Sequence, residues 1–132
     1  MSLAVVLLAA NTAFSEEIQL KFDRAGRFKI VQFTDLHLHE GGDKDRQTLA
    51  LIGEILDLEK PHLVVLTGDI LSGAAKRQET VALAAGPMAE RKIPWAVTLG
   101  NHDDEWPKEI DKPKDRRGLM EMFVRQPYSV SQ

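Results

Sequence analysis

The sequence of 132 residues predicts an α/β protein whose sheet is connected by crossover helices. Two short apolar runs carry this prediction: residues 62–66 ("HLVVL") and 93–99 ("IPWAVTL") have the length and composition of strands buried on both faces. Each run is preceded by a segment of helical pattern, as in a sheet built from βαβ units. The predicted order of elements is β-β-α-β-α-β-α-β.

The first half of the chain predicts a hairpin and a helix. Residues 18–22 and 27–34 both alternate apolar and polar side chains, and the turn residues "DRAG" lie between them. In residues 46–60 an apolar face of Leu49, Ile52 and Leu56 predicts an amphipathic helix. Pro61 is expected to end that helix.

The second half predicts two further helices and the start of a strand. Residues 79–92 have a helical composition, but Gly86 and Pro87 are expected to break or kink this helix. The charged, proline-containing residues 107–116 predict a solvated loop. Residues 118–125 ("GLMEMFVR") predict a short helix, and "YSVSQ" at the end of the sequence predicts the beginning of another strand.

Composition narrows the classes of function. The length allows one domain, which we place at residues 16–132, and the net charge of −3 gives no signature of nucleic-acid binding. Without cysteine, a metal ion would be held by His, Asp, Glu or Asn. The apolar residues 3–10 are too few for a transmembrane segment. Small residues before a cleavage point after Ser15 favour a signal peptide over residues 1–15, and so a secreted or periplasmic location, over an N-terminal strand or a disordered tail.

Polar residues directly follow three of the predicted strands. These are Asp35 and His37 after "KIVQFT", Asp69 after "LVVLTG", and residues 101–103 ("NHD") after "AVTLG". Because ligands of open α/β sheets bind beyond the carboxyl ends of the strands, we expect these groups to converge. Carboxylates, an amide and imidazoles suit a divalent metal ion.

The motifs D-x-H, G-D and G-N-H-D, in this order, resemble those of the calcineurin-like metallophosphoesterases, in particular the branch related to purple acid phosphatases. The resemblance runs from residue 18 to residue 132 and implies the N-terminal half of the family's α/β/β/α sandwich. It also implies hydrolysis of a phosphoester substrate by water that two metal ions (Fe, Mn or Zn) activate. Carried over by motif, Asp35 and His37 hold the first metal, Asp69 bridges both, and Asn101 holds the second. His102, with Asp103 beside it, meets the phosphate and assists the leaving oxygen.

The sequence departs from the family pattern at two places. Ser72 stands where purple members have a tyrosine ligand, which argues against an iron–tyrosinate centre. No histidine follows His102, whereas the family uses later histidines as ligands, so we expect an incomplete, N-terminal fragment of the domain. Two alternatives stay open. One is a secreted, non-catalytic binding domain with the same fold. The other is a phosphoesterase of the polymerase-and-histidinol-phosphatase type, which the spacing of Asp35, His37 and His39 resembles.

Overall fold

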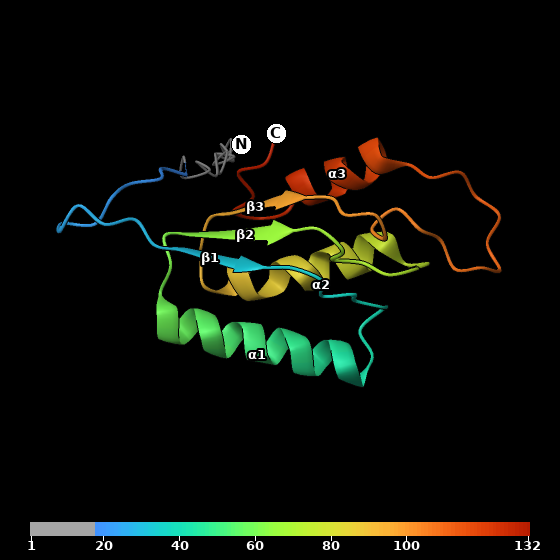
Figure 1. The fold of residues 1–132 in the computed structure, drawn as a ribbon, viewed down its shortest axis with the longest axis horizontal. Helices are drawn as coiled ribbons and strands as arrows, with labels where there is room; N and C mark the ends of the chain where they lie inside the picture. The colour runs from blue at the N-terminus through green and yellow to red at the C-terminus, as the bar shows by residue number, and fades with distance from the viewer. Residues whose placement is uncertain (1–17) are drawn as a thin grey trace, which may run out of the picture.

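The computed structural model describes residues 18–132 as a three-stranded parallel sheet with three helices (Figure 1). The strands are β1 (Ile30–Phe33), β2 (Leu63–Thr67) and β3 (Trp95–Thr98), in the order β1-β2-β3. The helices are α1 (Asp43–Glu59), α2 (Arg77–Glu90) and α3 (Arg116–Val124). The expected signal peptide lies outside the described residues. Within residues 18–132, no helix has both the length and the apolar character needed to cross a membrane.

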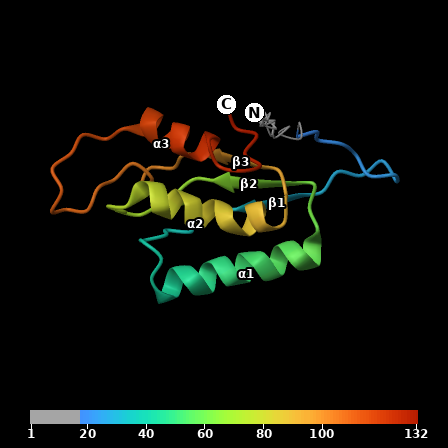
Figure 2. The same ribbon diagram turned by 180° about the vertical axis from the view of Figure 1, so that it is seen from behind.

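The helices lie side by side in the same order as the strands, and together they cover one face of the sheet (Figures 1 and 2). Alternate residues of the strands point into this layer, so that Val64, Leu66 and Trp95 are fully buried. On the opposite face, Ile30 is 55% exposed and β2 is only partly buried. This arrangement of one sheet covered by one helical layer confirms the expected α/β class, and it corresponds to one half of the expected sandwich.

The predicted N-terminal hairpin is wrong. Residues 18–22 form no strand, and Phe22 is 72% exposed. Only the turn exists: the carboxylate of Asp23 accepts hydrogen bonds from the backbone N–H groups of Ala25 and Arg27, both at 2.8 Å. The alternating pattern failed here because β1 pairs with β2 in parallel and no second strand lies on its other edge within the described residues.

Of the break or kink predicted in the second helix, the break is wrong, because α2 runs through Gly86 and Pro87 to Glu90. Pro87 lies in the last turn, so its missing N–H costs a single hydrogen bond near the end of the helix. Pro87 and Met88 are both buried, and this packing offsets the loss. The other helices appear where they were predicted, although α1 begins three residues earlier, at Asp43.

The last residues lie beside β3, as the predicted strand start requires. The N–H of Trp95 donates to the carbonyl of Tyr128 at 3.0 Å, and the N–H of Val130 donates to the carbonyl of Trp95 at 2.8 Å. The structure assigns this contact as an isolated parallel bridge between Trp95 and Ser129 rather than as a strand. Residues 128–130 therefore lie along the outer edge of β3 without forming a fourth strand.

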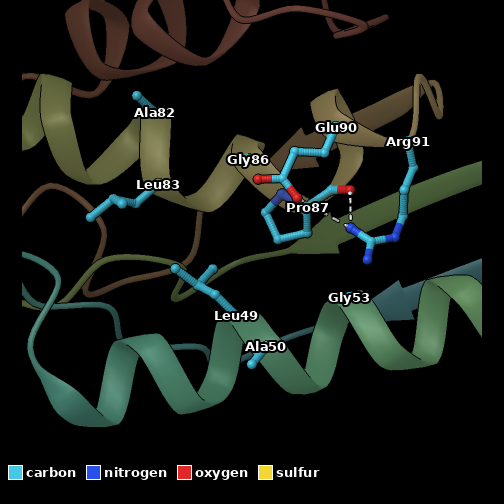
Figure 3. A pocket seen from close by; sticks show the side chains of 9 residues that line it. All are labelled: Leu49, Ala50, Gly53, Ala82, Leu83, Gly86, Pro87, Glu90 and Arg91. Atoms are coloured by element: carbon cyan, nitrogen blue, oxygen red, sulfur yellow. Dashed lines mark hydrogen bonds and ion pairs between the residues drawn. The ribbon is translucent and has the colours of Figure 1, made fainter.

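A pocket of about 330 Å³ lies between α1 and α2 (Figure 3). Its lining comes from these two helices and Arg91, whose guanidinium donates to the carbonyl of Pro87 and pairs with Asp57. Gly53 leaves the space that this guanidinium occupies, because an added Cβ would lie 2.9 Å from one of its nitrogens. None of the residues predicted for the metal site lines this pocket.

Candidate metal centre at the strand ends

The pairing of β1 with β2 continues beyond the ends of both strands. The N–H of Asp35 donates to the carbonyl of Gly68 at 3.1 Å, and the N–H of His37 donates to the carbonyl of Asp69 at 3.0 Å. A further bond joins Leu38 to Ile70 at 2.8 Å. These bonds align the loop after β1 with the loop after β2, and this alignment brings the first two motifs together.

Asp35, His37 and Asp69 each offer one ligand atom, and these three atoms lie within 4.8 Å of one another. All three residues have positive φ angles, of 55°, 47° and 50°. Such left-handed backbone is uncommon for residues other than glycine, and it concentrates at functional sites where the surroundings enforce it. The backbone thus holds three polar side chains in one cluster at a cost in conformational energy.

Two glycines allow the loops after β2 and β3 to meet. Gly68 has a φ of +95°, and a Cβ on it would lie 2.8 Å from the backbone nitrogen of Gly100. A Cβ on Gly100 would overlap the carboxylate of Asp69 and lie 2.5 Å from its backbone nitrogen. Any larger residue would push the two loops apart, so the glycines before Asp69 and Asn101 set the distance between the second and third motifs.

Asp103 holds the loops together from inside. Its side chain is fully buried and accepts four backbone hydrogen bonds, two at each carboxylate oxygen. Oδ2 accepts from Asp69 and Gly100 at 2.8 and 2.6 Å, and Oδ1 accepts from Ile70 and Leu71 at 2.7 and 2.9 Å. The structure therefore gives Asp103 a role in fixing the backbone of the site, and its catalytic part beside His102 stays a prediction.

His102 lies next to the cluster of Asp35, His37 and Asp69. Its backbone N–H donates to Oδ1 of Asp69 at 2.8 Å, and its ring centroid lies 5.5 Å from that of His37. The carboxylate that pairs with its ring is Glu105, with Nδ1 and Oε2 2.9 Å apart. This hydrogen bond and the negative charge of Glu105 raise the pKa of His102 above its usual value. Asn101 is exposed, and its place among the metal ligands stays a prediction.

Two arginines that sequence reasoning missed fix the loop after β3. The guanidinium of Arg77, on α2, donates to the carbonyls of Asp104 and Glu105 at 2.6 and 2.9 Å and lies 3.6 Å from the ring centre of Trp106. Arg116, on α3, donates to the carbonyls of Gly100 and Leu99 at 2.8 and 3.0 Å. No local pattern marks either arginine. Glu105 carried one signal, its spacing of three residues from His102.

His39 is not part of the cluster. Its ring nitrogen Nδ1 lies 2.9 Å from the carbonyl of Ser72, and its backbone N–H donates to Asp45. A site of the polymerase-and-histidinol-phosphatase type would use His39 together with Asp35 and His37. The observed contacts draw its side chain to the loop after β2, so the geometry speaks against that alternative.

The donor set of the cluster fits a metal ion. Two carboxylates and one imidazole suit ions such as Mn²⁺, Fe and Zn²⁺. The side chains of Asp35 and His37 are 60% and 43% exposed, so both can reach an ion that arrives from solvent. Nε2 of His37 lies 3.7 Å from Oδ1 of Asp35, a separation that leaves both atoms able to turn toward a shared ion.

Comparison with known proteins gives a consistent family. The profile described as calcineurin-like phosphoesterase matches residues 28–130. The chain is 47% identical to "Phosphatase DCR2" of Saccharomyces cerevisiae over 96 residues, which cover 61% of this chain and 17% of the yeast protein. It is 29% identical to "Probable inactive purple acid phosphatase 29" of Arabidopsis thaliana, over 100% of this chain and 36% of the relative. With "Probable inactive purple acid phosphatase 28" of the same plant, the identity is 31% over 89% of this chain and 32% of the relative.

The chain thus spans about a third or less of the length of these relatives. The family match nevertheless covers all three motifs and the whole of the observed sheet. The chain belongs to the calcineurin-like phosphoesterase family.

Proposed function

We propose that this chain contributes the residues that bind the first of two metal ions in the active site of a metal-dependent phosphoester hydrolase. The observation that carries the proposal is the cluster of Asp35, His37 and Asp69, whose ligand atoms lie within 4.8 Å of one another at the carboxyl ends of β1 and β2. The fully buried carboxylate of Asp103 supports it, because its hydrogen bonds to the backbone of Asp69 and Gly100 hold the loops of the site together.

Each residue has a distinct task in this proposal. Asp35 and His37 would hold one ion, Asp69 would serve both ions, and Asn101 would help to hold the second. When bound, such ions lower the pKa of water and neutralise charge at the phosphoryl group. His102 lies beside Asp69 and contacts the phosphate, and the loop bonds of Asp103 keep His102 and Asp69 in register.

The ligand count limits what the 132-residue chain does alone. Three side chains bring their ligand atoms together and could share one ion, whereas only Asp69 and Asn101 are proposed for a second. Imidazoles supply much of the affinity for transition metals, and none follows His102 in the sequence. The 132-residue chain is therefore expected to bind one divalent ion. The complete two-metal activity is proposed for a longer form, of which residues 16–132 are the N-terminal part.

Hydrolysis of p-nitrophenyl phosphate and bis(p-nitrophenyl) phosphate tests the proposal. The short chain is expected to give no metal-dependent turnover above background, because a two-metal clamp is worth several kcal/mol and each 1.36 kcal/mol is about tenfold in rate. A longer form from the same reading frame, with later histidines, is expected to turn over, and Asp69→Ala is expected to abolish this. An inactive longer form would contradict the proposed function. Turnover by the short chain would show that other residues complete the site.

A non-catalytic domain is the second candidate. The observation in its favour is that three plant relatives carry the word "inactive" in their names. Metal binding separates the candidates, because a domain that kept only the fold has no need to keep the ligand atoms of Asp35, His37 and Asp69 together. A chain that binds no divalent ion, in either the short or the longer form, would favour this second candidate.

A further inference from the structure

A cavity of about 480 Å³ adjoins the candidate metal centre at the start of α1. Its lining includes His37, one of the three residues of the metal cluster, together with Leu36, Lys44 and Thr48. Helix α1 begins at the end of the molecule where the strands finish, so this cavity, which we call the α1 cavity, lies beside the strand ends (Figure 1). A phosphoester whose phosphoryl group lies at the cluster can therefore extend the rest of its structure into the α1 cavity.

The loop that forms one wall of the α1 cavity is fixed on both sides. Oδ2 of Asp45, in the first turn of α1, accepts hydrogen bonds from the backbone N–H groups of His39 and Gly41, both at 2.8 Å. On the other side of the loop, the carboxylate of Glu40 accepts from the N–H of Ala75 at 2.9 Å. Small-molecule sites are usually concave and largely preformed, and this wall needs no rearrangement to receive a ligand.

The α1 cavity contains a cation that no other side chain neutralises. Both carboxylates of its lining are already bound, because Asp45 accepts the two loop bonds and Asp43 pairs with Arg46. Lys44 lies between them in the sequence and is exposed, and it makes no side-chain hydrogen bond or ion pair within residues 18–132. The charged group of this cavity that is free to meet a ligand is therefore positive.

We propose that the α1 cavity holds the leaving group of the substrate, and that Lys44 is a specificity-determining residue that favours a leaving group with a second anionic group, either a carboxylate or a phosphate. An ammonium group binds both anions as a point charge, so charge rather than shape defines this substrate class. The metal cluster and Lys44 would then hold the substrate at two separate points, which fixes its orientation. This inference rests on the proposed function, since it names the substrate class of the same site.

Alkylphosphonates, which are not hydrolysed, test the role of Lys44. Butylphosphonate has a single anionic group, 4-phosphonobutyrate adds a carboxylate, and butane-1,4-diphosphonate adds a second phosphonate. In calorimetry of the Mn²⁺-loaded 132-residue chain at low ionic strength, at least one of the two doubly charged ligands is expected to bind about threefold to tenfold more tightly than butylphosphonate, the effect of one charge-assisted contact. The larger of the two preferences identifies the anion that the cavity accepts.

Lys44→Gln removes the charge while keeping most of the side chain, and it is expected to bring the ratio of these affinities back to about one. Lys60→Gln, at the opposite end of α1, is the matched control and is expected to retain the preference. A Mn²⁺-loaded wild type without a preference for either doubly charged ligand would overturn the inference and leave metal binding in place. A preference that survives Lys44→Gln would also overturn it, because the metal ion would then be holding the added anion. If the wild type binds neither Mn²⁺ nor any of the phosphonates, the proposed function fails, and the inference fails with it.

Discussion

Replacing Asp103 by asparagine tests whether one buried carboxylate holds the two loops of the site together. The amide oxygen of the new side chain can keep the two bonds to Ile70 and Leu71, but its NH₂ group then faces the N–H groups of Asp69 and Gly100. Two bonds to a charged acceptor are lost, and each is worth about 1.5–3 kcal/mol when its donor is left buried. We therefore expect Asp103→Asn to lower the free energy of unfolding by about 3–6 kcal/mol, a large part of the ~5–15 kcal/mol of a typical domain.

Urea unfolding followed by circular dichroism measures this loss. With an m value near ~2 kcal/mol/M, the midpoint is expected to fall by about 1.5 M or more. Asp104→Asn is the matched control: Asp104 is also buried, but its carboxylate meets only Arg116 and Lys114 among the described residues, at 3.4 and 3.8 Å. Those cations are half or more exposed, so we expect a loss of about 1 kcal/mol or less. Equal losses in the two variants would refute the role assigned to Asp103.

Three further predictions follow from the same contacts. Gly100→Ala is expected to cost about 1–3 kcal/mol of stability, because the Cβ of the new alanine overlaps Asp69. Gly86→Ala, where the new Cβ enters open space on α2, is expected to stabilise the protein by roughly 0.5–1 kcal/mol. Unfolding midpoints of the two variants that shift in the same direction would contradict this. Because Glu105 raises the pKa of His102, the stability from this pair is fully present below the unfolded value of about 6.5 and is lost as pH rises through the higher folded value. NMR titration of the metal-free chain is expected to show the raised pKa, and Glu105→Gln is expected to bring it back toward 6.5; a wild-type value at or below 6.5 would be the wrong sign. Arg116→Ala is expected to loosen the loop after β3, seen as faster amide hydrogen exchange at residues 100–105, while Arg117→Ala, a neighbouring exposed arginine, is expected to leave exchange unchanged.

The sheet and the first two motifs of the site could be predicted from local pattern. The apolar runs around Val64 and Val97 have few alternatives to a buried strand, and parallel strands necessarily bring their carboxyl ends to one edge. The motif after each strand then placed Asp35, His37 and Asp69 correctly relative to the sheet. Strand order places the three residues at one edge of the sheet, and the backbone bonds between the two loops then bring their ligand atoms together.

The wrong predictions concern segments whose structure is decided by tertiary packing rather than by local sequence. Alternation in residues 18–22 is satisfied equally by a strand and by an exposed segment, and nothing local says whether a partner edge exists. Pro87 breaks a helix in isolation, but burial of the last turn of α2 overrides this. The roles of Asp103 and Glu105 depend on which carboxylate faces inward, and two neighbouring acids look alike in sequence until the loop closes around one of them.

Binding of Mn²⁺ to the 132-residue chain, measured by calorimetry, tests the central claim most directly. One ion per chain is expected, with affinity reduced at least about tenfold in Asp35→Asn, His37→Ala and Asp69→Asn, since each removes a ligand. Asp43→Asn, which removes an exposed acid at the start of α1, is expected to bind as the wild type does. Absence of binding by the wild type, or equal affinity in the wild type and the three cluster variants, would contradict a metal centre formed by Asp35, His37 and Asp69.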